Sequence, residues 1–425
     1  MKPATRFPGL KSIAAVFLMA PLAAACVSKA SSNKAPAPDD EVLVREAPVT
    51  NITEGRVAVY DPHVDYFPDK VQIERAAQLR VAYHKNYKVL TIIPRVNPDD
   101  RFDYVLVQRG TPAPPGVPTA RVIEVPVKRF MMLHNGFGLA VELLNLNDRL
   151  IAVADFKDVT VPGMRQMIEA GKIKEVGGPG HMDVERVIQL NPDLVMTYWS
   201  VSPEYSDHPK MDEVGIKTAA LATHWETTPL GAAEWIKAVA MFFNREKEAQ
   251  RIYDGIAQRY QELAARVSDT PYRPLVISGF PSRGRWRAMG PRNPALKLIE
   301  DAGGEYFIRR EERIGDYGQN MGFESVFRRH LDTDIWLDAP VGLKSIDDLL
   351  ARDKRASFFK PLQKGEVYTR RMNEKGQYFN YDQEDFMPDV QLADMIKILH
   401  PDKAPEHQLV FLRRLEPPKK PVAVE

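Results

Sequence analysis

The alternation of short strand-like and helix-like segments, in two long stretches, constrains the fold of this 425-residue chain more than any other sequence feature. In residues 126–243, apolar runs such as "RLIAVAD" and "DLVMTYW" alternate with helical patterns such as "PGMRQMIEAG". In residues 271–415, "PLVISGF" and "DIWLDA" alternate with helical patterns in the same way. Strands separated by helices pair in parallel through crossover connections. The sequence therefore predicts an α/β fold with two three-layer lobes.

A single long helix is predicted between the two lobes, in residues 244–270. Apolar residues recur there at helical spacing, at Ile252, Ile256, Tyr260 and Leu263. At 1.5 Å per residue, the stretch from Glu246 to Val267 alone corresponds to a rod of about 33 Å. No flexible Gly- or Ser-rich linker follows the first lobe. We therefore expect a stiff helix to join the lobes.

The N-terminal residues resemble an export signal. Lys2, Arg6 and Lys11 precede an apolar run from residue 13 to 25, which is the arrangement of a secretory signal peptide. Such a run would extend about 20 Å as a helix, too short for a hydrocarbon core of about 30 Å. We predict a signal peptide at residues 1–25 and an exported, periplasmic protein.

The only cysteine follows this apolar run directly. The stretch "LAAAC" resembles a bacterial lipobox, in which the cysteine is lipidated, although Leu22 stands one place earlier than usual. We expect Cys26 to carry a lipid anchor and residues 26–54, which are rich in Ala, Ser, Lys, Pro and Asp, to form a flexible tether. The alternative is ordinary signal cleavage that leaves a free thiol. Whether the anchor lies in the inner or the outer membrane is open.

Residues 55–125 differ from the rest of the chain. The runs "YKVLTII" and "DYVLVQRG" are rich in β-branched and aromatic residues and are bounded by turn signals. We predict a small β-rich extension that packs on the body of the protein. The sequence alone assigns it no role.

Composition and motifs argue against nucleic-acid binding and catalysis. The net charge is +1, and charged residues make up 27% of the chain, so no basic surface for nucleic acid is expected. The chain contains no Gly-x-Ser-x-Gly, no Gly-x-x-x-x-Gly-Lys and no His-Glu-x-x-His motif. We therefore expect that the chain is not an enzyme and has no cofactor of its own.

Two stretches carry a family resemblance. They are "VGGPGHMDVERVIQLNPDLVMTYW" at residues 176–199 and "GFESVFRRHLDTDIWL" at residues 322–337. Over residues 125 to 400 the chain resembles the helical-linker class of periplasmic substrate-binding proteins, which deliver ferric siderophores, cobalamin or heme to ABC importers. The resemblance implies a monomer whose lobes present the carboxyl ends of their strands to a shared cleft. It also implies that Glu185 and Glu324 dock on an ABC permease in the inner membrane.

Candidate ligand contacts are the polar and aromatic residues that follow the predicted strands. They are His134, Asn135, Tyr198, Trp199, His224, Trp225, Phe280, Arg283, Arg285, Trp286, Arg370 and Arg371. Arginine binds carboxylate or catecholate oxygens in two-point fashion, and aromatic faces cover flat parts of a ligand. We therefore expect a large anionic ligand, best represented by a ferric siderophore.

Other ligands remain open at this point. Heme could be bound with His134 or Tyr198 as the axial ligand, and cobalamin is a further candidate. A bare divalent ion would need His134, His224 and Glu226 to converge. A lipoprotein that hands its ligand over without an ABC partner is also compatible with the sequence.

Overall fold

The computed structural model describes residues 41–93, 101–178, 181–199, 208–308, 315, 318–372 and 383–419. The chain divides into two compact units, Met1–Glu41 and Val42–Glu425, and all of the elements below belong to the second. The predicted signal peptide and the predicted lipidation site at Cys26 lie outside the described residues. Within the described part of the chain, no helix has both the length and the apolar character needed to cross a bilayer.

The first lobe is built on a five-stranded sheet with the order β11-β10-β7-β8-β9, in which every pairing is parallel. Its strands are β7 (Phe130–Met132), β8 (Leu150–Val153), β9 (Lys174–Glu175), β10 (Leu194–Tyr198) and β11 (Thr218–Leu221). Its helices are α1 (Gly138–Leu143), α2 (Pro162–Glu169), α3 (Val184–Leu190), α4 (His208–Glu213), α5 (Pro229–Ala233) and α6 (Trp235–Met241). The predicted strand and helix alternation is confirmed here.

Local sequence signals explain where the helices begin and end. The Asp183 side chain accepts a hydrogen bond from the backbone N–H of Arg186 and so caps the start of α3. Asn191 then ends this helix in a left-handed conformation, directly before Pro192, which cannot continue it. The chain is thereby turned into strand β10.

The second lobe contains a sheet with the order β14-β12-β16-β17-β18, parallel except for the last pair. Its strands are β12 (Leu275–Ser278), β14 (Glu305–Tyr306), β16 (Ile335–Ala339), β17 (Val367–Arg370) and β18 (Leu412–Arg414). Its helices are α8 (Pro294–Asp301), α9 (Phe323–Arg329), α10 (Ile346–Arg352), α11 (Lys360–Lys364) and α12 (Pro388–Leu399). An antiparallel ribbon of β13 (Arg285–Met289) and β15 (Gly318–Gly322) adjoins this sheet's core.

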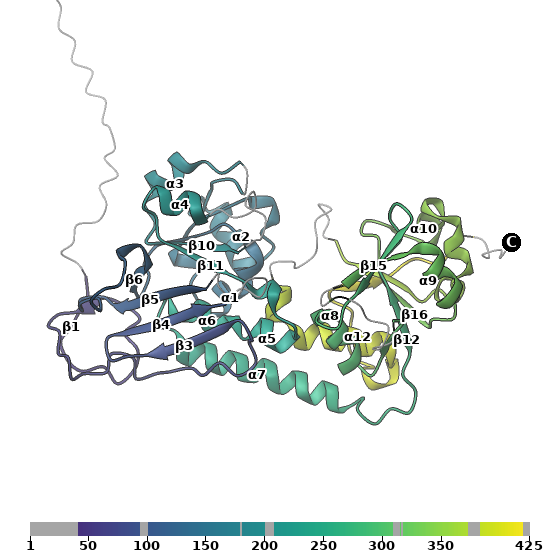
Figure 1. Cartoon of the computed structure of the whole chain (residues 1–425), viewed down its shortest axis with the longest axis horizontal. Helices are drawn as coiled ribbons and strands as arrows, with labels where there is room; N and C mark the ends of the chain where they lie inside the picture. The colour runs from purple at the N-terminus through teal and green to yellow at the C-terminus, as the bar shows by residue number, and fades with distance from the viewer. Residues whose placement is uncertain are drawn as a thin grey trace, which may run out of the picture. The chain divides into compact units, whose positions relative to one another are not determined.

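A long helix, α7 (Glu246–Ala265), connects the lobes, and Figure 1 shows it passing from one to the other. Tyr253, Ile256 and Tyr260 form its buried stripe, and α12 of the second lobe packs along it. Twenty residues give a rod of about 30 Å. The fold is therefore two α/β lobes joined by one helix, as the sequence predicted.

The N-terminal extension forms a four-stranded sheet in the order β3-β4-β5-β6. Its strands are β3 (Leu79–Tyr83), β4 (Tyr87–Ile92), β5 (Phe102–Gln108) and β6 (Val122–Val125). Ahead of it, residues 42–54, which we expected to belong to the tether, are instead packed on the folded unit. There β1 (Leu43–Val44) pairs with β2 (Arg56–Val57), and the buried Asn51 side chain donates to Glu246 Oε2 at 2.8 Å. The predicted tether boundary is therefore corrected to about residue 41.

Buried ionic groups hold the extension on the first lobe. The Glu234 carboxylate accepts backbone N–H groups from residues 74–76 at 2.6–3.2 Å and also accepts from Lys237 Nζ. Lys88 of β4 forms a fully buried ion pair with Glu246, at the first residue of α7. A buried charge is tolerated only when it is paired and hydrogen-bonded. The extension is therefore an integral part of the fold.

Candidate ligand-binding cleft

Three sequence candidates of the first lobe meet at the carboxyl ends of neighbouring parallel strands. His134 follows β7, Tyr198 ends β10, and His224 follows β11. The ring centroids of His134 and Tyr198 are 4.5 Å apart, and those of Tyr198 and His224 are 5.4 Å apart. Parallel strands bring their carboxyl ends to one edge of the sheet, which is where open α/β sheets bind ligands. The structure thus unites residues that lie 90 positions apart.

The two imidazoles in this cluster are neutral at physiological pH. Burial, and secondarily the neighbouring His224, lowers the pKa of His134 from 6.5 to about 4. Desolvation by the surrounding lobe lowers the pKa of His224 to about 4 as well, although the residue as a whole is exposed. His134 Nδ1 accepts the backbone N–H of Gly136 at 3.3 Å, so a neutral His134 carries its proton on Nε2. A neutral His134 can therefore donate a hydrogen bond only through Nε2.

The other first-lobe candidates surround this cluster. The centroid of Trp225 lies 5.3 Å from His224 and 5.7 Å from Trp199, and Trp199 itself is buried. Asn135 is buried too, and its Oδ1 has no hydrogen-bond partner among the described residues. A buried polar atom without a partner calls for a donor from a ligand or a water molecule. Asn135 therefore fits the edge of a binding site.

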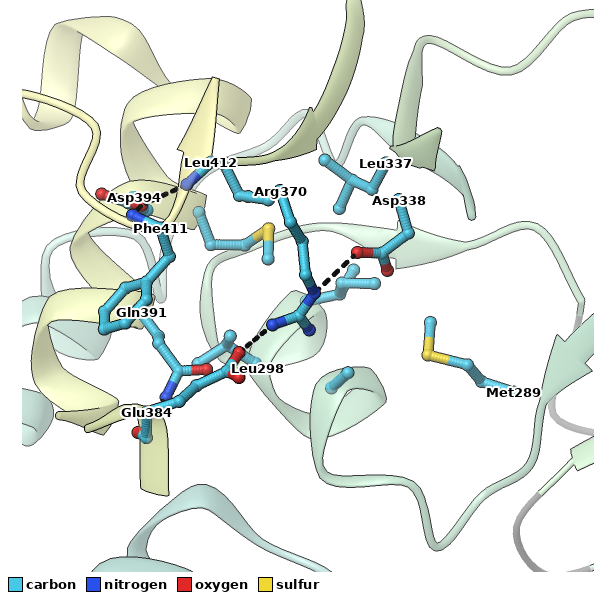
Figure 2. A pocket seen from close by; sticks show the side chains of 13 residues that line it. Met289, Leu298, Leu337, Asp338, Arg370, Glu384, Gln391, Asp394, Phe411 and Leu412 are labelled. Atoms are coloured by element: carbon cyan, nitrogen blue, oxygen red, sulfur yellow. Dashed lines mark hydrogen bonds and ion pairs between the residues drawn. The ribbon is translucent and has the colours of Figure 1, made fainter. Parts of the chain in front are cut away.

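In the second lobe, Arg370 lines a pocket at the ends of β16 and β17. Figure 2 shows its guanidinium between the carboxylates of Asp338 and Glu384; Arg370 Nε lies 3.4 Å from Asp338 Oδ1, and Nη1 pairs with Glu384 Oε1. Leu298 and Phe411 contribute apolar walls. The predicted ligand arginine is therefore placed in the cleft, but two carboxylates already share its charge.

Asp338 has an unusual backbone. Its φ is +51° within the last residues of β16, and the register of β16 against β17 shifts between Trp336 and Ala339. A non-glycine residue in this region is strained and is held there by its surroundings, often at a functional site. The distortion accompanies a carboxylate that faces Arg370. The rule that found His134, a polar residue at the end of a strand, would also have found Asp338.

The short helix η10 (Glu384–Phe386) links the two faces of the cleft. Asp385 hydrogen-bonds to Thr223, next to His224, and Gln383 Nε2 donates to Thr160 at 3.2 Å. Burial raises the pKa of Asp385 to about 6, with the Thr223 hydrogen bond opposing and Glu384 adding to this shift. A pocket of about 220 Å³ lies between Pro229 and Ala232 of the first lobe and Arg370, Glu384 and Asp385 of the second. No strand signal precedes η10, so sequence reasoning missed its residues.

The remaining arginine candidates lie at the turn of the β13–β15 region. Ser282 and Arg285 exchange backbone hydrogen bonds of 2.8 and 3.0 Å around Arg283 and Gly284, whose φ values are +51° and +74°. This is the pattern of a type I′ turn. Arg283 and Arg285 are exposed, and neither forms an ion pair with any described residue. Arg371 is exposed and donates to the Leu409 carbonyl at 2.8 Å.

Trp286 faces the opposite way from Arg285. It is fully buried, its indole N–H donates to the Ser278 carbonyl at 2.8 Å, and its ring lies 5.6 Å from that of Trp336. Successive residues of a strand point to opposite faces, which explains the contrast with Arg285. Phe280 lies over Trp336 at 6.3 Å and is half-buried. Trp286 therefore supports the floor of the cleft from within the core, and we do not carry it forward as a ligand contact.

The two predicted docking carboxylates lie on different lobes. Glu185 is exposed in the first turn of α3, and Glu324 is exposed in the first turn of α9. Glu324 Oε1 lies 3.6 Å from Arg355 Nη1, where both side chains are about half exposed or more. An ion pair of this kind contributes little to stability. Both carboxylates are thus accessible to a partner.

A bare metal site is not supported by these side chains. Glu226, which we considered as a ligand together with His134 and His224, is buried and accepts N–H groups from Ala77, Gln78 and Trp235. Across the described ranges, no group of three or more His, Cys, Asp and Glu side chains is arranged to hold a metal ion. Through these hydrogen bonds, Glu226 instead holds the N-terminal extension on the first lobe.

Two uncharacterized lipoproteins of Methanocaldococcus jannaschii are relatives of this chain. The first is 24% identical over 299 residues, which cover 66% of this chain and 67% of the relative. The second is 23% identical over 313 residues, which cover 70% and 76%, respectively. Their names support an exported lipoprotein and leave the ligand open.

Solved structures show the same fold at low identity. A possible iron-binding, periplasmic solute-binding protein of Staphylococcus epidermidis is 14% identical with a TM-score of 0.51, over 64% of this chain and 98% of that one. An ABC transporter substrate-binding protein of Listeria monocytogenes is 18% identical with a TM-score of 0.50, over 64% and 99%. The Ni–His complex of Helicobacter pylori CeuE is 17% identical with a TM-score of 0.50, over 66% and 85%.

The sequence profile of the periplasmic binding proteins matches residues 141–372. This match spans more than half of the chain, from α1 of the first lobe, through α7, to the residues that follow β17. It therefore includes the strand ends that form most of both faces of the cleft. The chain belongs to the periplasmic binding protein family, whose members bind solutes.

Proposed function

We propose that this protein captures an anionic iron chelate of the ferric-siderophore type in the cleft between its lobes and delivers it to an ABC permease. The observation that carries the proposal is the pair of exposed arginines, Arg283 and Arg285, without ion-pair partners among the described residues. An unpaired, exposed guanidinium is suited to carboxylate or catecholate oxygens. The iron-binding name of the Staphylococcus epidermidis neighbour is consistent with this ligand class.

The first-lobe cluster supports a ligand with flat surfaces. His134, Tyr198 and His224 offer ring faces and neutral imidazoles, not charges. Such a surface can cover the aromatic parts of a chelate, while the arginines of the second lobe bind its anionic oxygens. A ligand that bridges the cleft would then contact both lobes.

Delivery and anchoring complete the proposal. Glu185 and Glu324, one on each lobe, are suited to reversible charge pairing with arginines of a permease. We propose that residues 1–25 are removed, that Cys26 carries a lipid, and that the residues up to about 41 tether a monomer to the membrane. The lipoprotein names of the two relatives support this anchoring.

Heme is a second candidate ligand because His224 is exposed and its ring is neutral. Neutral imidazole is the form that binds heme iron. His134 suits this role less, since its Nδ1 accepts from Gly136 and its proton is placed on Nε2. We therefore expect His224 or Tyr198 as the axial ligand if heme is the solute.

The ligand class can be tested by tryptophan fluorescence of the protein lacking residues 1–26. We would titrate it with ferric catecholate, ferric hydroxamate, ferric citrate, hemin, cobalamin and Zn²⁺. Saturable quenching by an iron chelate, with Kd raised about 10- to 100-fold in Arg283→Ala or Arg285→Ala, is the expected result. Binding of hemin that is lost in His224→Ala would instead establish the second candidate. Binding of cobalamin or Zn²⁺ alone would contradict both.

Delivery can be tested separately with the double variant Glu185→Gln, Glu324→Gln. Because these carboxylates lie on the lobe surfaces, the variant should bind ligand normally but fail to support ligand uptake in cells that depend on this protein. The control is Glu300→Gln, which changes one charge on another helix, α8. Normal uptake by the double variant would favour handover without an ABC permease.

A further inference from the structure

We infer that the exposed face of the β13–β15 ribbon is a ligand shelf, on which Arg285 and Arg287 bind anionic oxygens and Gly322 leaves room for a flat ligand. This inference rests on the proposed function and deepens it. It names the shape and charge of the ligand portion that the second lobe recognises. It also adds two residues, Arg287 and Gly322, that the strand-end rule did not select.

The alternation of β13 separates its residues into two faces. Trp286 and Ala288 are buried in the core of the lobe, whereas Arg285 and Arg287 are exposed. Met289 belongs to the same face as the two arginines, because side chains two residues apart share a face. Met289 also lines the pocket that contains Arg370, and Figure 2 shows it on the side of that pocket away from Glu384. The arginine face therefore continues outward from the cleft pocket.

The partner strand adds almost no bulk to this face. Arg285 pairs with Gly322, Arg287 with Asn320, and Met289 with Gly318. Directly paired residues of an antiparallel ladder point to the same side. The arginines consequently stand beside a strip that contains two glycines and one short amide.

Gly322 is the N-cap residue of α9, a position that accepts glycine but does not require it. Its φ of −64° is accessible to any residue, and a Cβ atom built on it would meet no heavy atom within 4 Å. Gly318 differs, because its φ is +148° and a Cβ there would lie 2.4 Å from the Ala288 carbonyl oxygen. Glycine is thus required by the fold at position 318 but not at position 322. Open space beside Arg285 is the property that a ligand would use.

The charges on the shelf are unmatched. Neither Arg285 nor Arg287 forms an ion pair with a described residue. Alternate residues of a strand are about 6.5 Å apart, so the two guanidiniums can reach separate oxygens of one ligand. A flat-faced chelate with anionic oxygens at its periphery fits this arrangement. Two classes of ligand have flat surfaces with anionic oxygens at their periphery: a ferric tris-catecholate and a tetrapyrrole dicarboxylate.

The test uses the protein lacking residues 1–26 and two probes, the ferric complex of 2,3-dihydroxybenzoate and hemin. Arg287→Gln removes one charge from the shelf, and Gly322→Leu covers the strip without altering charge. We expect each to raise the Kd of the bound probe about 10- to 100-fold. Arg328→Gln, on the neighbouring helix α9, is the matched charge control and should leave Kd unchanged. Gly322→Leu should melt close to the wild-type temperature, because a Cβ atom at this position meets no heavy atom within 4 Å.

The outcomes separate the shelf from the proposed function. A probe that binds the wild-type protein and is weakened by Arg287→Gln and Gly322→Leu, but not by Arg328→Gln, supports the shelf and identifies the source of the ligand chemistry. Wild-type binding that both shelf variants retain overturns the shelf and leaves the proposed function standing. Absence of binding by either probe to the wild-type protein overturns both the shelf and the anionic, flat-faced ligand class.

Discussion

The two faces of the cleft carry different kinds of side chain. On the first lobe, His134, Tyr198 and His224 present aromatic and neutral imidazole rings. On the second lobe, Arg370 lies between two carboxylates, and the ribbon carries unpaired arginines. Rings provide contact area at small desolvation cost, whereas arginines discriminate by charge and geometry. The difference suggests that the first lobe contributes broad affinity and the second lobe contributes specificity.

The largest expected effect distinguishes Trp286, a tryptophan of the core, from Trp225, a half-buried candidate ligand contact. Trp286→Ala should reduce the free energy of unfolding by about 3–5 kcal/mol, because it empties a fully buried site between Trp336 and Phe359. Trp225→Ala should cost about 1–2 kcal/mol, since that side chain is only half-buried. Urea unfolding followed by circular dichroism measures both.

Ligand titration of the same two variants sharpens the contrast. Trp225→Ala should weaken ligand binding at temperatures where it remains folded. A Trp286→Ala protein as stable as the wild type would contradict the assignment of Trp286 to the core. Equal stability losses in the two variants would remove the distinction between supporting and lining residues.

The second prediction uses the opposite pH responses of the two faces. The pKa of His134 is lowered by burial from 6.5 to about 4, so its neutral form favours the folded state and stability is lost as pH falls from 6.5 toward 4. The pKa of Asp385 is raised by burial to about 6, so its protonated form favours the folded state and stability is lost as pH rises from about 4 through 6. Urea midpoints at several pH values between 4 and 7 measure both contributions.

Substitution should separate these two contributions. His134→Asn retains an acceptor for the Gly136 N–H but does not titrate, so the variant should lose less stability on acidification than the wild type. Asp385→Asn should lose less stability than the wild type as pH rises through 6. If both variants follow the wild-type pH profile, neither residue has a shifted pKa in the folded protein.

The smallest expected effect concerns ligand affinity when one of the two carboxylates that pair with Arg370 is removed. Glu384→Gln leaves Asp338 as the one acidic neighbour that pairs with Arg370 among the described residues. The guanidinium should then bind an anionic chelate about 2- to 10-fold more tightly, as fluorescence titration would show. Glu366→Gln is the matched control, since Glu366 pairs with Arg414 near the other end of β17. Weaker binding by Glu384→Gln would mean that Glu384 holds Arg370 in its binding position.

The strand-end rule succeeded where the elements were regular. It selected His134, Tyr198 and His224 from separate parts of the chain, and the parallel sheet brings their rings together. It selected Trp286 as well, because this residue comes shortly after the predicted strand "PLVISGF". The structure shows that β13 begins at Arg285. The alternation of Arg285, Trp286 and Arg287 already contained the signal of a strand with one buried face.

Other parts of the site could not be found along the chain. Glu384 meets Arg370 although no strand signal precedes it, and Asp385 meets Thr223 across a large sequence separation. The tether boundary is a similar case: residues 42–54 lack periodicity, yet Asn51 is fixed by Asp69 and by Glu246, 195 positions away. Pairing of this kind depends on which polar groups the fold leaves side by side.

The sequence by itself determined the class of fold, the long connecting helix and the sheet edge at which His134, Tyr198 and His224 gather, because hydrophobic periodicity and chain direction are local properties. The tertiary structure alone decided which arginines are neutralised and which are unpaired. The strand-end rule selected Arg370 and Arg285 alike. Folding places two carboxylates against Arg370, whereas none of the described carboxylates pairs with Arg285. Charge compensation acts through space, and no spacing along the chain encodes it.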